Sequence, residues 1–210
     1  MVLLLAALHL PLVEKPVVTG RSYFALLLTG DGGWRAIDAG LAAEINRQGI
    51  PVAGFLSDEY FREKRTPEEL TRDIDSVIAH YAALWRKPRV ILIGFSRGAD
   101  AIPIVLAHMS PASRQRVALV ALLGAAHSAE LQVVPFWKQS TVPSIALAPL
   151  IHQVKGVPIL CVHGEDEEES LCDVIAQGDA VELRIPGGHH FGGRYTEIAR
   201  SILAALPARP

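Results

Sequence analysis

Short apolar runs alternate along the chain with longer segments in which apolar residues recur at helical spacing. The apolar runs have the length of β-strands and lie at 22–30, 51–55, 89–94, 116–124, 157–164 and 180–186. The helix-like segments lie at 34–50, 66–85, 97–109, 168–177 and 193–205. The pattern therefore predicts strands and helices in alternation.

The segment 66–85 carries the clearest helix signals. Thr66 can cap its N-terminus, Pro67 suits the first helical position, and Glu69 stands three residues after the cap. Its apolar residues form one stripe that we expect to be buried, made of Leu70, Ile74, Val77, Ile78 and Tyr81.

Repeated strand, helix, strand units of this length predict an α/β fold with a doubly wound, mostly parallel sheet and right-handed crossovers. The run 89–94 is apolar on both faces, as a central strand covered by helices on each side requires. One irregular segment, 125–156, is the sole insertion, so we expect no large lid. A chain of 210 residues fits a single domain over 1–210.

Residues 1–16 contain a further apolar run, which predicts a first strand. The run is too short to span a bilayer, and it lacks the basic region and the small-residue cleavage site of a signal peptide. Residues 1–8 are nevertheless more apolar than a surface strand needs. They therefore also fit the remnant of an export signal or of an upstream segment.

Composition and charge exclude some classes of partner. Half of the residues are hydrophobic and the mean hydropathy is +0.28, which is typical of a densely packed chain and not of a disordered one. The formal net charge of −2 attracts neither nucleic acid nor an acidic membrane surface in bulk. We therefore expect no nucleic-acid partner and no transmembrane segment, and any ligand must be recognised by local groups.

The two cysteines, Cys161 and Cys172, have no further ligand at the spacing of a zinc site. They are either two buried thiols or a disulfide that closes a short loop, and the spacing alone leaves both open. The neighbouring His189 and His190 lack an evident third ligand. The sequence thus predicts neither a metal nor a cofactor.

The stretch GFSRG, residues 94–98, follows an apolar strand and precedes a helix. It matches the G-x-S-x-G turn, in which the two glycines prevent a collision around a serine held in strained backbone geometry. Ser96 also lies at the N-terminus of its helix, where developing negative charge is favoured. The stretch predicts Ser96 as a nucleophile, against the alternative of a tight turn with a capping serine.

A second glycine-rich loop, LTGDGGWR at 28–35, follows the strand at 22–30. A tetrahedral intermediate needs two backbone N–H donors, one from the residue after the nucleophile and one from an early loop. The amide of Arg97 and the amide of Asp31, or else that of Gly32, are the candidates for this oxyanion hole.

Two later loops supply an acid and a base. In CVHGEDEEES, 161–170, the position after the strand favours Glu167 as the acid, with Asp166 as the alternative. In IPGGHHFGG, 185–193, His189 is the expected general base, and His190 would stack or orient. The chain order of serine, acid and histidine is that of an α/β hydrolase. It favours ester hydrolysis through an acyl-enzyme on Ser96.

Six stretches carry a resemblance to a known family: LTGDGGWRAID, TPEELTRDI, LIGFSRGADAIP, LAPLI, CVHGEDEEESLC and PGGHHFGGRY. The chain resembles the bacterial virulence proteins VirJ and AcvB from about residue 10 to its end. The resemblance implies a periplasmic α/β hydrolase, and AcvB-like members are described as hydrolases of lysyl-phosphatidylglycerol, an aminoacylated membrane lipid. Export in turn favours a Cys161–Cys172 disulfide and implies that a signal or an upstream domain is missing from this sequence.

The sequence departs from the family pattern at two places near the expected pocket. The residue after the nucleophile is Arg97 where an aromatic is expected, and SDEYFR at 57–62 stands in place of a stretch like SLRYFW. We expect an acidic residue to receive the ammonium of the aminoacyl group, and the candidates are Asp31, Asp58, Glu59 and Asp100.

Two other functions remain open from the sequence. A general carboxylesterase or thioesterase would use the same three residues on another acyl group. A non-catalytic adaptor of hydrolase fold would bind secretion-system proteins instead.

Overall fold

The computed structural model describes residues 9–18, 21–134, 141–175 and 178–207. The expectations for residues 1–8 therefore lie outside the described residues. Seven strands form the main sheet: β1 (Leu12–Lys15), β2 (Tyr23–Leu28), β3 (Val52–Phe55), β4 (Arg89–Phe95), β5 (Val117–Leu123), β8 (Ile159–Gly164) and β9 (Val181–Ile185).

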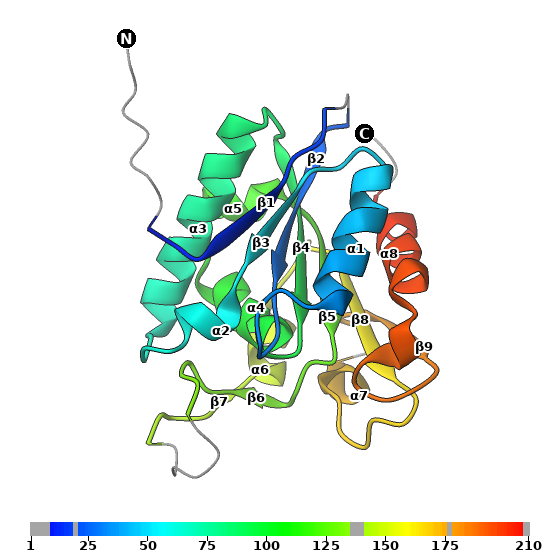
Figure 1. Cartoon of the computed structure of the whole chain (residues 1–210). Helices are drawn as coiled ribbons and strands as arrows, with labels where there is room; N and C mark the ends of the chain where they lie inside the picture. The colour runs from blue at the N-terminus through cyan, green and yellow to red at the C-terminus, as the bar shows by residue number, and fades with distance from the viewer. Residues whose placement is uncertain (1–8, 19–20, 135–140, 176–177, 208–210) are drawn as a thin grey trace.

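The sheet has the strand order β1-β3-β2-β4-β5-β8-β9 (Figure 1). β1 pairs antiparallel with β3 at one edge, and every other pairing is parallel. The predicted mostly parallel, doubly wound sheet is confirmed. β4 is central and fully buried over Val90–Phe95, as its two apolar faces require.

The helices are α1 (Ala36–Arg47), α2 (Ser57–Tyr60), α3 (Pro67–Leu84), α4 (Arg97–His108), α5 (Pro111–Arg116), α6 (Ala148–Gln153), α7 (Leu171–Ile175) and α8 (Tyr195–Ala204). A 3₁₀ turn covers Phe191–Gly193, and a short antiparallel hairpin joins β6 (Ser128–Ala129) to β7 (Ile145–Ala146). The short elements α2, α5, α6 and the hairpin were not expected from the sequence, because less than two helical turns leave no readable period.

The helices cover the sheet on both faces. α1 and α8 lie side by side on one face, where Leu41, Ile45 and Ile198 share a core with Leu27 and Ile93. α3, α4, α6 and α7 pack on the opposite face (Figure 1). The loops that follow β2, β4, β5, β8 and β9 lie at the carboxyl ends of the parallel strands, which share one edge of the sheet.

The N-terminus of α3 has the predicted capping box. Glu69 N–H donates to Thr66 Oγ1 at 3.2 Å, and the backbone N–H of Thr66 donates to Glu69 Oε2 at 2.9 Å. Pro67 occupies the first turn, as expected. These bonds satisfy two amides that the helix itself leaves without acceptors.

We expect Thr66→Ala to lower the free energy of unfolding by about 1 kcal/mol, because one of these amides loses its acceptor. Urea unfolding followed by circular dichroism measures the change. Ser76→Ala is the matched control, since Ser76 is exposed in the middle of α3 and its hydroxyl donates to Arg72 O. An equal loss in the two variants would contradict the capping role.

Candidate active site

The turn between β4 and α4 holds Ser96 in a strained conformation. Its φ of 51° and ψ of −123° place a non-glycine residue outside the usual regions. The flanking glycines permit the turn, because a Cβ on Gly94 would lie 2.5 Å from Gly98 O and a Cβ on Gly98 would lie 2.2 Å from Leu28 O. The collision argued from the G-x-S-x-G pattern is therefore present in the fold.

An acid and a histidine meet across the loops after β8 and β9. His189 Nδ1 and Glu167 Oε1 are 2.6 Å apart, so the ring N–H donates to the carboxylate. The second oxygen, Oε2, accepts from the Gly164 amide at 2.6 Å. The carboxylate is thus held on both sides, and it fixes which ring nitrogen carries the proton. The other nitrogen, Nε2, is left to accept.

The His189 ring lies beside the Ser96 turn. Ser96 N–H donates to Leu123 O at 2.8 Å, and a Cβ on the next residue, Gly124, would lie 2.8 Å from the His189 ring. The His189 ring centroid is also 5.2 Å from that of Phe95, the residue before the serine. The fold therefore gathers serine, histidine and acid from three loops at the carboxyl edge of the sheet.

The pKa values of the pair shift in opposite directions. Burial acts to raise the pKa of Glu167, but the hydrogen bonds from His189 and Gly164 outweigh it and hold the pKa below its ordinary value. The hydrogen bond to Glu167 raises the pKa of His189 above its ordinary value of 6.5, against the opposing effect of burial. Each partner stabilises the charged form of the other.

The structure separates the alternatives that the sequence left open for these two roles. Asp166 is exposed, and its N–H donates to Gly187 O, while its neighbour Glu167 faces the histidine. His190 is exposed and lines a second cavity of about 200 Å³ beside Gly30, with its ring centroid 5.7 Å from that of Phe95. The geometry thus favours the pair Glu167 and His189.

The glycine-rich loop after β2 approaches the serine closely. A Cβ on Gly30 would lie 3.1 Å from the Cβ of Ser96, so Asp31 follows directly at the site. Within the described part of the chain, neither the Asp31 amide nor the Arg97 amide donates a hydrogen bond to another protein group. Both candidates for the oxyanion hole therefore have an N–H to offer.

The serine opens into a cavity of about 290 Å³ with an acidic lining. The charged residues on its wall are Asp31, Arg97, Asp100 and Glu130, and Ser96 lies among them. The sequence candidates Asp58 and Glu59 do not line this cavity: both sit on α2, where Asp58 lies against Gly33 and Glu59 is exposed. Glu130, which no sequence motif marks, lines the cavity from the irregular segment.

Asp100 lies one helical turn after the nucleophile. One of its carboxylate oxygens accepts from the Ala126 amide at 2.7 Å. Burial raises its pKa to about 7, although the Ala126 hydrogen bond, Arg97 and His189 act in the opposite direction. A carboxyl that is costly to ionise in the free protein gains most when a cation enters beside it.

The family model described as Bacterial virulence protein (VirJ) matches residues 22–210. The chain belongs to the VirJ family. The resemblance read from the sequence motifs is thereby confirmed, over nearly the whole chain. A search of curated proteins finds no match.

Solved structures show that this VirJ-family chain has the α/β-hydrolase fold. A lipase-esterase related protein from Clostridium acetobutylicum superposes with a TM-score of 0.68 at 14% identity, covering 94% of this chain and 99% of that one. XC6422 from Xanthomonas campestris, described as an a/b serine hydrolase without lid, gives 0.58 at 16% identity, with 95% and 90% covered. A thioesterase domain from the curacin biosynthetic pathway gives 0.62 at 13% identity, with 92% and 99% covered.

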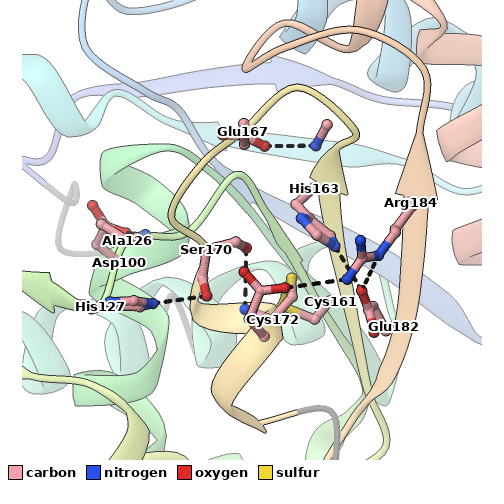
Figure 2. The surroundings of a disulfide bond; sticks show 12 residues. Asp100, Ala126, His127, Cys161, His163, Glu167, Ser170, Cys172, Glu182 and Arg184 are labelled. Carbon is pink, nitrogen blue, oxygen red and sulfur yellow. Dashed lines mark hydrogen bonds and ion pairs between the residues drawn. A yellow bond between two sulfur atoms is a disulfide. The ribbon is translucent and has the colours of Figure 1, made fainter.

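A disulfide joins Cys161 on β8 to Cys172 on α7, the pairing that the family resemblance favours (Figure 2). The two Cα atoms are 5.4 Å apart, and the loop that the bridge closes carries Glu167. The end of that loop is also tied to the segment after β5, since Leu171 N–H donates to Ala125 O at 2.9 Å and the Ser170 carbonyl lies 2.9 Å from His127 Nε2. The acid loop of this family member is therefore anchored at both ends.

Figure 2 shows His163 and Glu182 beside the disulfide. Together with Asp173 they could offer three ligand atoms to a metal ion. Arg184 already supplies the positive charge there, with Nε 2.6 Å from Glu182 and Nη2 3.3 Å from Asp173. His163 Nε2 lies 2.8 Å from the same Glu182 oxygen. The cluster is thus a charge network around a guanidinium, and it is built differently from a metal site.

Among the described residues no helix is long and apolar enough to cross a membrane.

Glu167→Gln should lower the pKa of His189, because the hydrogen bond that favours the imidazolium is weakened. A general base must be neutral, so kcat/KM of the wild type should rise with pH through the His189 pKa, and in the variant this rise should move to lower pH. The value that kcat/KM reaches at high pH should fall by roughly a thousandfold or more. NMR titration of the His189 ring in a Ser96→Ala background measures the pKa directly.

Asp166→Asn is the matched control, since it removes a neighbouring carboxylate that is exposed. It should change neither the His189 titration nor the value of kcat/KM at high pH. A larger effect from Asp166→Asn than from Glu167→Gln would reverse the assignment of the acid.

Proposed function

We propose that the protein is a serine hydrolase of esters, and that its substrate is the aminoacyl ester of an aminoacylated phospholipid such as lysyl-phosphatidylglycerol. The single observation that carries the proposal is the meeting of three loops: the strained Ser96, the His189–Glu167 pair beside it, and an acidic cavity onto which the serine opens. The family membership and the fold support the same reaction class.

The chemistry follows from the roles of these groups. Ser96 Oγ attacks the ester carbonyl while His189 Nε2 takes its proton, and Glu167 stabilises the imidazolium. The amides of Asp31 and Arg97 donate to the oxyanion. The C–O bond of the lipid alcohol then breaks, and His189 returns the proton to the leaving oxygen. Water, deprotonated by His189, then attacks the carbonyl carbon of the aminoacyl-enzyme. The bond from that carbon to Ser96 Oγ breaks, His189 returns the proton to Oγ, and the free amino acid is released.

The acidic wall suits the cationic acyl group. The α-ammonium of an aminoacyl ester lies two bonds from the reacting carbonyl carbon, so its acceptor must lie close to the nucleophile. Asp100 follows Ser96 by one turn of α4, and the two residues share the cavity. The Asp31 carboxylate, in contrast, is already engaged by Arg97. We therefore assign the α-ammonium to Asp100.

The location of the substrate is part of the same proposal. An aminoacylated lipid exposed outside the cytoplasm requires a periplasmic enzyme, and a Cys161–Cys172 disulfide is stable in an oxidising compartment. We expect a site without a large lid to be reachable by a lipid headgroup at a membrane surface. Fractionation of the native host, with the disulfide assayed by thiol labelling under denaturing conditions, tests this location.

Wild-type protein incubated with lysyl-phosphatidylglycerol vesicles should release lysine and phosphatidylglycerol, and Ser96→Ala should lower the rate by roughly ten-thousand-fold or more. Thin-layer chromatography of the lipid measures the reaction. Unchanged lipid with the wild type would reject the substrate. Rapid turnover of short neutral p-nitrophenyl esters or of acyl thioesters in its place would favour a general carboxylesterase or thioesterase.

A fluorophosphonate probe separates the enzyme from a non-catalytic adaptor of a secretion system. Folded wild-type protein should be labelled at Ser96, whereas Ser96→Ala should not. Absence of labelling in folded wild type would favour the adaptor.

Asp100→Asn should weaken the preference for an acyl group that carries a free α-ammonium. The measurement is the ratio of kcat/KM for a lysyl ester to that for its Nα-acetyl counterpart, which lacks the α-ammonium. Loss of an ion pair in a partly buried site should lower this ratio by roughly tenfold or more. Asp58→Asn is the control, because Asp58 does not line the cavity. An unchanged ratio in Asp100→Asn would exclude the assigned contact.

A further inference from the structure

Arg97 connects three loops of the active site through its side chain. Its Nε bonds to Asp31 Oδ1 and its Nη2 donates to Asp31 Oδ2 at 3.0 Å, so the guanidinium and the carboxylate form a two-point pair. Its Nη1 donates to the Glu130 carbonyl at 3.2 Å. One side chain thus joins the nucleophile turn to the loop after β2 and to the segment after β5.

The two partners of this pair are also the two residues whose amides are assigned to the oxyanion. We propose that the Arg97–Asp31 ion pair is a positioning device, which holds the two loops so that both amides point at one oxygen. The inference rests on the proposed function, because it needs an oxyanion to form at Ser96.

The physical need for such a device follows from the loops themselves. Two amides can stabilise the same oxygen only if their separation stays within a few tenths of an ångström of the productive geometry. Arg97 is fixed by α4, but Asp31 lies in a turn followed by Gly32 and Gly33, with φ of 97° and 74°, and glycines resist ordering. A guanidinium fork fixes both distance and direction, which a single point charge does not.

The pair contributes little to folding stability by comparison. The Asp31 side chain is 58% exposed and that of Arg97 is 22% exposed, and ion pairs at such positions stabilise proteins weakly. If the pair positions the amides, breaking it should lower kcat and leave the melting temperature nearly unchanged. If the pair were mainly structural, breaking it would lower the melting temperature.

The choice of arginine also shapes substrate recognition. Because Asp31 is neutralised, Asp100 and Glu130 are left as the unpaired acids of the cavity wall among the described residues. Arg97 thus gives the loop after β2 an ion-paired support.

Arg97→Ala and Asp31→Asn tested singly and together distinguish these roles. Each single variant should lower kcat by roughly 10- to 100-fold with KM nearly unchanged, since misplacing one donor costs less than the hundredfold or greater loss from removing it. The double variant should lose little more than either single one, because both break the same pair. Arg97→Lys, which keeps the charge but loses the fork, should recover only part of kcat.

The rate of fluorophosphonate labelling gives a readout that needs no identified substrate, because the probe places its phosphoryl oxygen where the oxyanion forms. It should slow in Arg97→Ala and in Asp31→Asn, while the melting temperature stays close to that of the wild type. Arg72→Ala is the control, since Arg72 is an exposed arginine next to an acid on α3.

The inference would be overturned by an unchanged labelling rate in both single variants, or by a change in KM with kcat retained. It would also be overturned if the losses of kcat in the two single variants multiplied in the double variant. Slower labelling that accompanies a large fall in melting temperature would likewise overturn it. Absence of labelling in the wild type would instead reject the proposed function itself. The two failures are therefore distinguishable.

Discussion

The left-handed backbone at Ser96 is the constraint around which the active site is arranged. β4 is buried where it enters the turn, and α4 packs against β2 where it leaves the turn. Neither Gly94 nor Gly98 therefore has room for a side chain. The serine is therefore lifted out at the carboxyl edge of the sheet, at the N-terminus of α4. Strain of this kind persists only because the surrounding strands and helices fix the backbone on both sides.

Rigid support extends from this turn to the groups that serve it. The β8 strand carries the acid loop, the disulfide and the contacts to Ala125 hold that loop at its ends, and the Gly164 amide holds the second oxygen of Glu167. His189 is then fixed between this carboxylate and the Phe95 ring. Each candidate catalytic group is thus positioned by contacts with residues that the proposed reaction does not use, which is what a preorganised site requires.

The carboxylates of the site differ in their electrostatic environment. Glu167 is held ionised by the hydrogen bonds it accepts, Asp31 is paired with Arg97, and Asp100 is buried enough that its pKa rises to about 7. Three acids of the candidate active site thereby differ in charge state and in partner, because their hydrogen bonds and their burial differ.

Hydrophobic periodicity predicted the alternating α/β order and the burial of β4 on both faces. Short motifs predicted the capping box of α3 and the Ser96 turn, because a cap and a tight turn depend on residues within a few positions of one another. The order of the loops likewise identified the candidates for acid and base. Only the tertiary structure placed Glu167, and not Asp166, against His189, paired Arg97 with Asp31 and brought Asp100 and Glu130 to the cavity while leaving Asp58 and Glu59 outside it. Those choices depend on contacts between residues far apart in the chain, and such contacts exist only once the strands are placed side by side.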